Sequence, residues 1–599
     1  MGTIIQTREQ FDSMVNTLQG SSLLAIDTET SGFNGKIIGI SFFSSRTENH
    51  LDKNGYYLPM RHEHDPNLFQ NLSNIPYEWI SELKPILSSL DRIFVFHNYK
   101  FDIKKLWDDG LDVPIERVFD TMIASWMIDE NTPNSLDSCA ERQLGRKKVE
   151  GIKKLADSLG GWEKVPPDVM GTYAITDAEL THLLYPIFKR HLEDQEMHLL
   201  METEMKFSRC LAQIERTGVR VDLERTRQYA LEAESRMKEI QTTLGFDPAK
   251  PSQLARKLYE AEPEGLGLLP QHLSARKLKS SILLSDGRSI NFIPMMAKGV
   301  LDSYSHPVVD LVLEYRSRSK ALSSYFLAYL TKSGPDLRIH PTYKHHGTVT
   351  SRLSCSEPNM QQIPRTTPEE QEEGVSKALI KTLFLASEGY ELWEFDYSQI
   401  EFRLAACYAK EPTIIEGYKQ GKDFHQITAE VLGVDRYTAK QTNFAILYGA
   451  GPRKLAEQLW RLANVKLTES EAREILSNWR GAYPRLQNVI LEAERAASRG
   501  FIRYWDGRRR HFQFASEHHK AFNSACQGGA ARIMIKTMIQ VAEEAPECPI
   551  VAQVHDALWM EIPIDNKDYW IEKTKKVMEW PGKDFTLEFP VDCHKLGVG

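Results

Sequence analysis

The stretch ELWEFDYSQIEFRL, residues 391–404, alternates aromatic and acidic side chains along the part that is predicted to be a strand. The period of two in a strand places Glu394 and Asp396 on one face. The other face then carries three aromatic side chains, Trp393, Phe395 and Tyr397. A sheet that packs only one face on a core shows this pattern. We therefore expect Asp396 to point toward the open face of a sheet.

The stretch VAQVHDALWMEI, residues 551–562, is typical of a hairpin with His555 and Asp556 at its tight turn. A carboxylate beside strand-forming residues loses solvation unless a hydrogen bond, a cation or a metal ion compensates it. The predicted partners of Asp556 are metal ions that it shares with Asp396 across the sheet. For the hairpin taken alone, the alternative is a solvated aspartate at its tip.

The stretch RYTAKQTNFAILYG, residues 436–449, predicts a helix that ends near Gly449. Steps of four residues place two cations and then two aromatic rings on one stripe of this helix: Arg436, Lys440, Phe444 and Tyr448. Such a stripe suits a triphosphate and a stacked base. The alternative is an amphipathic helix with its cations outside and its aromatic rings in the core.

A second acidic constellation lies near the N-terminus. In LLAIDTETSG, residues 23–32, alternation puts Asp27 and Glu29 on one face of a strand, where two carboxylates repel each other unless cations lie between them. Further acidic groups and a tyrosine follow in HNYKFDIKKL and YAITDAEL, namely Asp102, Tyr173 and Asp177. Four acidic groups could hold two divalent metal ions for phosphodiester hydrolysis, with Tyr173 orienting the attacking water. Each fragment alone is more often an ordinary surface pair.

The bulk numbers bound the class of protein. The 599 residues predict three to five domains. Hydrophobic residues at 41% and charged residues at 26% are those of a soluble globular protein, without the ~20-residue apolar run that crosses a bilayer. Seven cysteines without a C-x-x-C pair argue against a disulfide framework or a zinc site. The start of the chain carries no secretion signal, so we expect a cytoplasmic protein.

The overall net charge of −8 does not indicate a nucleic-acid binder, but basic residues gather locally. The pattern along the chain predicts an α/β domain over the first 195 residues, with strands near 23–26, 37–43 and 93–96. Mainly helical sequence follows to about residue 330, interrupted by segments with glycine and proline near 262–308. A long helical section over 400–499 comes before a strand pair at 550–562.

The N-terminal set, in its order, resembles the DEDD family of 3'-5' exonucleases in its tyrosine-bearing subclass, over residues 20–185. The segments DYSQIEFR, RYTAKQTNFAILYG and QVHDAL resemble motifs A, B and C of A-family, Klenow-like DNA polymerases. Further matches occur in family order at residues 348–364, 423–429, 483–487, 507–510 and 523–531. The resemblance implies a multidomain α/β and α+β protein, with an RNase H-like exonuclease domain followed by a right-hand polymerase.

The resemblance also implies roles for individual residues. It implies two Mg²⁺ ions per active site, with Mn²⁺ as a substitute. The ligands in the polymerase would be Asp396, Asp556 and the Tyr397 carbonyl. The ligands in the exonuclease would be Asp27, Glu29, Asp102 and Asp177. The nucleotide would be bound by Arg436, Lys440, Phe444, Tyr448, Gln399 and His425, with Glu401 blocking a sugar 2'-OH. Primer, template or nascent pair would be contacted by Arg352, Asn359, Gln362, Asn523, Gln527 and His555.

The implied domains are an exonuclease over 1–195, mainly thumb over 196–335, palm over 336–404 and 511–599, and fingers over 405–510. The sequence departs from the family at Ala557, where a glutamate is usual, and over 260–300, the expected thumb tip. The absence of a segment before the exonuclease predicts a chain without the 5'-nuclease of many relatives, like a phage or viral replicase. If a phage encodes it, we expect it in the cytoplasm of the bacterial host.

We therefore expect template-directed, primer-dependent DNA synthesis from dNTPs with 3'-5' proofreading, on primer-template DNA and with unidentified replisome partners. Two alternatives stay open. A single-subunit RNA polymerase would share the palm, although Glu401 and the exonuclease domain argue against it. A nuclease or DNA-binding protein with an inactive polymerase module is the other, motivated by Ala557.

Overall fold

The computed structural model describes residues 2–32, 35–46, 54–63, 72–271, 273–364, 376–463 and 465–597. The chain forms two compact units. The first unit comprises Met1–Thr217, Tyr343–Ser354 and Ile490–Pro546. The second comprises Gly218–Thr342, Cys355–Val489 and Glu547–Gly599. No helix within the described ranges is both long enough and apolar enough to cross a membrane.

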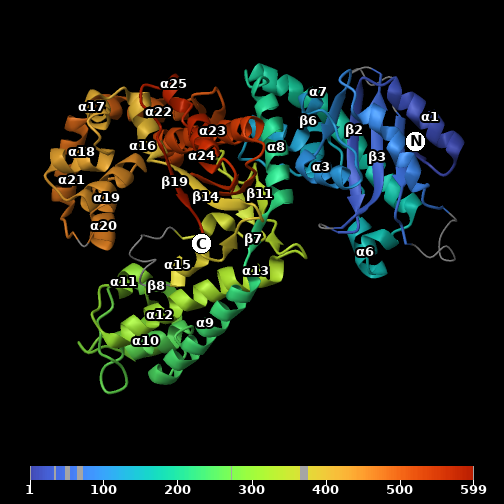
Figure 1. Ribbon diagram of the computed structural model, residues 1–599. Helices are drawn as coiled ribbons and strands as arrows, with labels where there is room; N and C mark the ends of the chain where they lie inside the picture. The colour runs from blue at the N-terminus through green and yellow to red at the C-terminus, as the bar shows by residue number, and fades with distance from the viewer. Residues whose placement is uncertain are drawn as a thin grey trace. The chain divides into compact units, whose positions relative to one another are not determined.

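The first unit is built on a six-stranded sheet of order β1-β4-β3-β2-β5-β6 (Figure 1). Its strands are β1 (Thr3–Ile4), β2 (Leu23–Thr30), β3 (Ile37–Ser45), β4 (Asn54–Pro59), β5 (Ile93–Phe96) and β6 (Val118–Asp120). The pairs β2–β3 and β3–β4 are antiparallel, whereas β1–β4, β2–β5 and β5–β6 are parallel. The strands predicted at 23–26, 37–43 and 93–96 are thereby confirmed.

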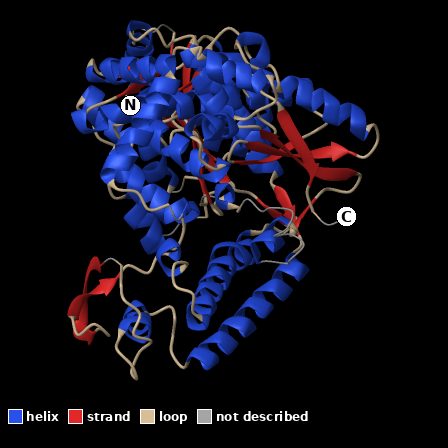
Figure 2. Cartoon of the chain, turned by 90° about the vertical axis from the view of Figure 1, so that its left-hand side faces the viewer, coloured by secondary structure: helices blue, strands red, loops and turns tan. Residues whose placement is uncertain are grey.

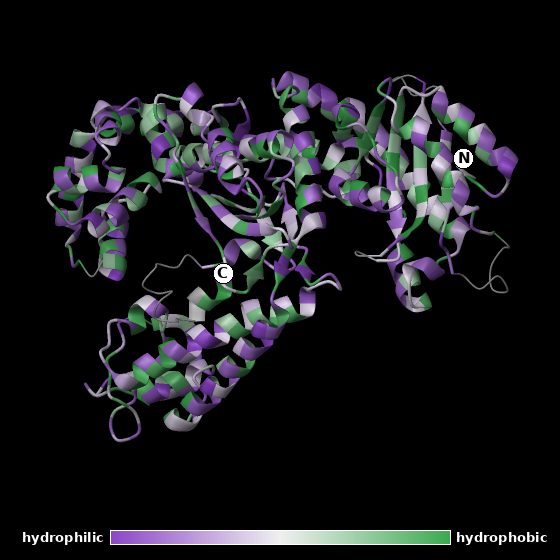
Figure 3. Ribbon diagram, in the orientation of Figure 1, coloured by the Kyte–Doolittle hydropathy of each residue, from purple (hydrophilic) through white to green (hydrophobic). Residues whose placement is uncertain are grey.

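Helices complete the first unit. Those of its N-terminal part are α1 (Arg8–Gln19), α2 (Lys84–Leu87), α3 (Tyr99–Asp108), α4 (Thr121–Ile128), α5 (Leu136–Leu144), α6 (Ile152–Leu159), α7 (Pro167–Asp194) and α8 (Leu200–Thr217). The long helix α7 contacts β2, β3 and β4, and all of β3 is buried. Apolar residues, green in Figure 3, accordingly run along these strands.

Later segments of the chain return to the first unit. They include the hairpin β15 (Phe501–Arg503) and β16 (Arg509–His511) and the helix α23 (Ala521–Glu544), which contacts α8. Helix α22 (Pro484–Ser498) begins in the second unit and ends in the first.

The second unit contains a four-stranded antiparallel sheet of order β17-β18-β14-β19. Its strands are β14 (Tyr390–Tyr397), β17 (Ile550–Val554), β18 (Ala557–Pro563) and β19 (Val591–Lys595). The predicted strand at 393–397 and the predicted strand pair at 550–562 are confirmed. Phe395 and Tyr397 are buried and Asp396 is half-buried, as predicted, but Trp393 is only half-buried and Glu394 is buried, so the two faces of the strand differ less than the alternation predicted.

Helices of the second unit fall into three sequence groups. The predicted helical section after residue 400 contains α16 (Ile400–Ala409), α17 (Pro412–Lys419), α18 (Phe424–Leu432), α19 (Arg436–Leu447), α20 (Pro452–Ala463) and α21 (Glu469–Ala482). An earlier group comprises α9 (Leu223–Leu244), α10 (Pro251–Tyr259), α11 (Lys298–Leu301), α12 (Pro307–Ala321), α13 (Leu327–Lys332) and α15 (Ser376–Lys381). Near the C-terminus lie α24 (Lys567–Met578) and α25 (Pro581–Asp584).

The segment near 262–308 holds a feature that the sequence pattern did not predict. It contains an antiparallel ribbon of β8 (Leu273–Leu283) and β9 (Ser289–Pro294), visible as strands beside the helices in Figure 2. Ile282 and Ile290 are buried in a small core with residues of α10 and α12. The ribbon was missed because register shifts interrupt the alternation of apolar and polar side chains.

Candidate active sites

The turn between β17 and β18 brings the two predicted acidic residues of the second unit to neighbouring positions of the sheet. In the register of β14 and β18, Asp396 lies opposite Ala557, so Asp556 is the next residue along. The Tyr397 N–H also donates to the Asp556 carbonyl at 3.3 Å. The predicted hairpin and its two-residue turn are therefore confirmed, and both carboxylates lie at one end of the sheet.

The tip of this hairpin is held in an uncommon backbone conformation. His555 has a φ of 56°, in the left-handed region that side-chain-bearing residues rarely adopt. The Gln553 side chain donates to the His555 carbonyl, and the Gln361 side chain donates to Gln553 Oε1 at 2.6 Å. His555 Nε2 lies 3.4 Å from the Ile363 carbonyl oxygen. These contacts fix the turn that carries Asp556.

The acidic side chains on the polar face of β14 have different surroundings. Glu394 is buried and forms an ion pair with Lys381, with 2.9 Å between Nζ and Oε2. Its Oε2 also accepts a hydrogen bond from Trp559 Nε1 at 2.6 Å. Asp396 is half-buried and lines a small cavity together with His555 and Ala557. Glu394 lines the same cavity, so the two acids differ in that the charge of Glu394 is compensated by Lys381.

Helix α19 carries the predicted stripe of cations and aromatic rings. It begins after Asp435, whose side chain caps it, and ends at Leu447 with Gly449 in a left-handed conformation. The predicted helix and its stop are therefore confirmed. Arg436 is exposed and pairs with Asp423, with 3.0 Å between Nε and Oδ2.

The rings of this stripe are not wholly in the core. Phe444 packs edge-on against Phe402 with 4.9 Å between centroids and stacks on Tyr448 at 6.0 Å. Tyr448 keeps 40% of its surface exposed. Next to them lies His425, which is buried on α18. Burial lowers its pKa to about 4; the charge of Asp423 opposes this shift, and those of Arg436 and Lys440 add to it. A buried neutral imidazole, two cations and two rings thus lie close together on α18 and α19.

The residues after β14 lead into helix α16. Gln399, its N-cap, has a φ of 55°, and its Oε1 accepts a hydrogen bond from the Tyr418 hydroxyl at 3.2 Å. Glu401 is half-buried in the first turn of the same helix. Both predicted nucleotide-binding residues therefore follow Asp396 directly on one strand-to-helix junction.

The residues predicted to contact DNA are distributed over both units. Arg352, Asn523 and Gln527 belong to the first unit, and each is half-buried. Asn359, Gln362 and His555 belong to the second unit and are exposed. Within the second unit, Asn359 caps the short turn Met360–Gln362, which leads to the Ile363 carbonyl beside His555.

The first unit gathers three of its four predicted acids. Asp27 and Glu29 on β2 and Asp177 on α7 each offer a carboxylate oxygen within 4.8 Å of the others. Burial and the neighbouring Asp177 raise the pKa of Asp27 to about 7. Tyr173, one helical turn before Asp177, is half-buried at the same place. Carboxylates in this arrangement repel one another and are a donor set that suits a divalent cation.

The fourth acid has a different partner. Asp102 on α3 is only 3% exposed, and its Oδ1 accepts hydrogen bonds from the Thr28 N–H at 3.0 Å and the Thr28 hydroxyl at 2.7 Å. Burial, together with the charge of Asp27, raises its pKa. Asp102 therefore lies near the cluster but outside the group of three.

One charged residue at this cluster was missed by the sequence analysis. Lys148, in the loop between α5 and α6, forms an ion pair with Asp177. Its ammonium lies 4.9 Å from the centroid of the Tyr173 ring. The sequence offers only a basic run, RKK at 146–148, which gives no sign that one lysine turns inward.

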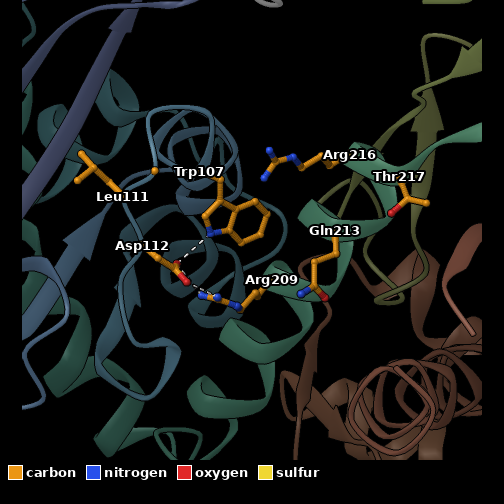
Figure 4. Close-up of a pocket in the computed structure, with 8 residues that line it drawn as sticks. Trp107, Leu111, Asp112, Arg209, Gln213, Arg216 and Thr217 are labelled. Atoms are coloured by element: carbon orange, nitrogen blue, oxygen red, sulfur yellow. Dashed lines mark hydrogen bonds and ion pairs between the residues drawn. The ribbon is translucent and has the colours of Figure 1, made fainter. Parts of the chain in front are cut away.

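Two other features of the first unit do not coincide with predicted sites. A pocket of about 370 Å³ lies between α3 and α8, where Arg209 and Arg216 flank Trp107 (Figure 4). A group of Asp129, Glu130 and His511 could offer metal ligands, but Glu130 already pairs with Arg510 at 2.9 Å. Its negative charge is thus already compensated.

Comparisons with known proteins agree with this arrangement. The sequence model of DNA polymerase family A matches residues 225–598, and that of 3'-5' exonucleases matches residues 3–193. The chain is 27% identical to DNA polymerase I of Borreliella burgdorferi, over 98% of this chain and 63% of that protein. It is 27% identical to DNA polymerase I of Pseudomonas aeruginosa, over 100% of this chain and 65% of that protein.

A phage relative is covered more completely. The chain is 27% identical to DNA polymerase DpoZ of Salmonella phage PMBT28, over 94% of this chain and 93% of that protein. By contrast, it spans less than two thirds of the two bacterial relatives. Its fold is similar to the POL domain of Pol1 from M. smegmatis, solved with DNA primer-template and dNTP, with a TM-score of 0.79 and 20% identity over 99% of this chain and 98% of that one.

Proposed function

The chain belongs to DNA polymerase family A, and we propose that it extends a DNA primer on a template with dNTPs and removes nucleotides from the primer 3' end. The observation that carries the proposal is the adjacency of Asp396 and Asp556 at one end of the second unit's sheet. The acidic cluster in the segment that matches 3'-5' exonucleases supports the second activity.

Asp396, Asp556 and the Tyr397 carbonyl are proposed to hold Mg²⁺ ions for synthesis. The donors fit this group, because all are oxygen atoms and the carboxylates occupy neighbouring positions across a rigid strand pair. When bound, the ions would activate the primer 3'-hydroxyl and stabilise charge on the phosphates. The protein's own contribution is to fix Asp556 in the turn that His555 and Gln553 hold, with Asp396 on the neighbouring strand.

The surface of α19 is proposed to bind the incoming nucleotide. Arg436 and Lys440 would contact the triphosphate, with the neutral His425 beside them. Phe444 and the exposed face of Tyr448 offer a stacking surface for the base pair that forms. Glu401, in the first turn of α16, would exclude the 2'-hydroxyl of a ribonucleotide, with Gln399 as its neighbour.

Asp27, Glu29 and Asp177 are proposed to hold the metal ions of the exonuclease, with Asp102 beside them. Their fit rests on three carboxylate oxygens within 4.8 Å of one another, which repel unless cations intervene. Tyr173 would orient the attacking water toward the terminal phosphodiester.

The ribbon β8–β9 is proposed to contact the DNA backbone. Arg276, Lys277 and Lys279 on β8 are exposed and form no ion pair within the described part of the chain. Lys277 lies opposite the partly exposed Phe292.

Segment 196–335 would then be mainly thumb, with palm over 336–404 and 511–599, fingers over 405–510 and exonuclease over 1–195. Residues Arg352, Asn359, Gln362, Asn523, Gln527 and His555 would contact primer, template or the nascent pair. The protein would act in the cytoplasm.

The test is extension of a labelled primer by one nucleotide on a DNA template. The proposal predicts dNTP-dependent extension that requires a divalent cation. A chain that degrades the primer and never extends it would support a nuclease with an inactive polymerase module. Synthesis from rNTPs without a primer would support a single-subunit RNA polymerase.

A further inference from the structure

Lys148 brings a positive charge into the acidic cluster of the first unit. Its ammonium forms an ion pair with Asp177 and lies 4.9 Å from the centroid of the Tyr173 ring. The side chain is 26% exposed, compared with 59% for the preceding Lys147, which pairs with the equally exposed Glu141. Two successive lysines thus have opposite surroundings.

The loop that carries Lys148, residues 145–151, is fastened to its neighbours. Arg146 forms a two-pronged ion pair with Glu179 on α7, with distances of 3.1 and 2.9 Å. The backbone N–H of Lys148 donates to Asp137 Oδ1 on α5 at 3.1 Å. Contacts on both sides of the loop therefore set the point from which the lysine side chain enters the cluster.

The cluster needs a positive charge even before a metal ion binds. Burial and Asp177 raise the pKa of Asp27, while the charge of Lys148 opposes that rise. The Lys148 ammonium pairs with Asp177 Oδ2, whereas Asp177 Oδ1 is buried without a hydrogen-bond partner within the described residues. A divalent ion bound to this carboxylate would therefore lie beside a protein cation that repels it. The lysine therefore compensates the charge of the acidic cluster and opposes the binding of a divalent ion there.

Resting on the proposed exonuclease function, we propose that Lys148 is a positioning residue and an internal counter-ion of this site. It holds Asp177 beside Tyr173 in the absence of metal and competes with the divalent cation for Asp177. Lys148 thereby sets the metal concentration at which degradation of the primer begins, without affecting the metal sites at Asp396 and Asp556.

The experiment is calorimetric titration of the full chain with Mn²⁺. Subtracting the titration of Asp27→Ala isolates the sites of the acidic cluster. Lys148→Gln should bind Mn²⁺ there at least about fivefold more tightly, the factor that one unit charge about 4 Å from another exerts in water. Lys147→Gln, the matched control in the same loop, should bind like the natural protein. Lys148→Arg keeps the charge and should stay within about twofold of the natural affinity.

Activity gives a second readout. With Lys148→Gln, the Mg²⁺ concentration for half-maximal degradation of a single-stranded primer should fall about fivefold, as for Mn²⁺ binding, whereas primer extension keeps its Mg²⁺ dependence. Unchanged Mn²⁺ affinity in Lys148→Gln would overturn the inference. About fivefold tighter Mn²⁺ binding by Lys148→Arg, which keeps the charge, would overturn it as well. That second outcome can be measured even if the glutamine variant does not fold. If the natural protein and Asp27→Ala titrate identically, the proposed exonuclease site itself is wrong and the inference falls with it.

Discussion

Asp556 and Ala557 occupy neighbouring positions in the hairpin turn, and their substitution should have very different effects. Asp556 is half-buried and adjacent to Asp396, whereas the buried Ala557 pairs with Asp396 only through the strand register. Asp556→Ala should lower the single-turnover extension rate at least ~10²-fold, the lower end of losses when one electrostatic contact of a transition state is removed. Ala557→Glu should change the rate less than ~10-fold, on the order of 1.4 kcal/mol.

Rapid-quench extension over a Mg²⁺ and Mn²⁺ titration measures both variants. If the natural protein does not extend at any metal concentration and Ala557→Glu restores extension, then Ala557 marks an inactivated polymerase. Equal rates for Asp556→Ala and the natural protein would remove Asp556 from the metal site.

Glu401 allows a test of sugar selection by a single side chain. It lies half-buried in the first turn of α16, five residues after Asp396. Glu401→Ala should relax discrimination against rNTPs by ~1 to 3 kcal/mol, the range in which a pocket rejects one small added group. The measurement is the ratio of kcat/KM for dNTP and rNTP in single-nucleotide extension, with Glu416→Ala on the surface of α17 as control. An unchanged ratio counts against the assignment.

The ribbon β8–β9 is the element whose role depends most on charge. Arg276, Lys277 and Lys279 are exposed in a chain with a net charge of −8. Lys277→Ala with Lys279→Ala should weaken duplex DNA binding and reduce the slope of log K against log salt by about 2, since each phosphate contact contributes about 1. Lys575→Ala with Lys576→Ala on α24 is the control. Equal slopes in a fluorescence anisotropy titration would show that the ribbon does not contact DNA.

Helices α8 and α23 of the first unit are joined by a buried charge network. Glu204 on α8 pairs with Arg532 on α23 and with His345. Burial opposes the charge of Glu204, but Arg532 and His345 outweigh it and lower its pKa to about 2. A carboxyl whose folded pKa is depressed stabilises the fold above its unfolded pKa of about 4.3, and this contribution is lost as pH falls from about 4.3 to 2.

Glu204→Gln should therefore destabilise the protein at neutral pH, by about 3 kcal/mol for removal of one partner from a buried pair. It should also flatten the fall of thermal stability below pH 4.3, because the titrating group is gone. The control is Glu202→Gln, two residues earlier on the same helix. Because the Glu202 side chain is 65% exposed and pairs with Lys206 at the surface, this substitution should change the stability little. Equal melting temperatures for the two variants across that pH range would refute the role of the network.

Elements with a strong periodic pattern could be predicted from the sequence, and those without one could not. The strand at Trp393–Tyr397 and the turn at His555–Asp556 follow from alternation and a two-residue turn, which are local properties. The ribbon β8–β9 could not be predicted because its register shifts break the alternation. Lys148 could not be predicted because its ion pair joins residues 29 positions apart through the fold of a loop.

For the site residues, the sequence indicated which acids to consider but not their geometry. Asp27, Glu29 and Asp177 come together as the pattern indicated. Asp102 instead bonds to Thr28, a contact between a helix and the strand beside it that no spacing along the chain encodes. Asp396 and Asp556 were predicted as partners from two separate motifs, and the strand register makes them neighbours.

The whole molecule is proposed to hold two independent active sites, one in each compact unit. The acidic cluster belongs to the first unit, and Asp396 and Asp556 belong to the second. Because no predicted metal ligand is shared between them, loss of one activity should leave the other intact.

The most direct measurement follows one labelled primer, matched or mismatched at its 3' end, under single-turnover conditions with Mg²⁺ and dNTPs. The natural protein should extend the matched primer and shorten the mismatched one. Asp27→Ala with Glu29→Ala should retain extension and lose shortening, while Asp396→Ala should show the reverse. If the natural protein shortens primers but does not extend a matched one with Mg²⁺ or Mn²⁺, or if the double variant still shortens them, the account of two separate active sites is contradicted.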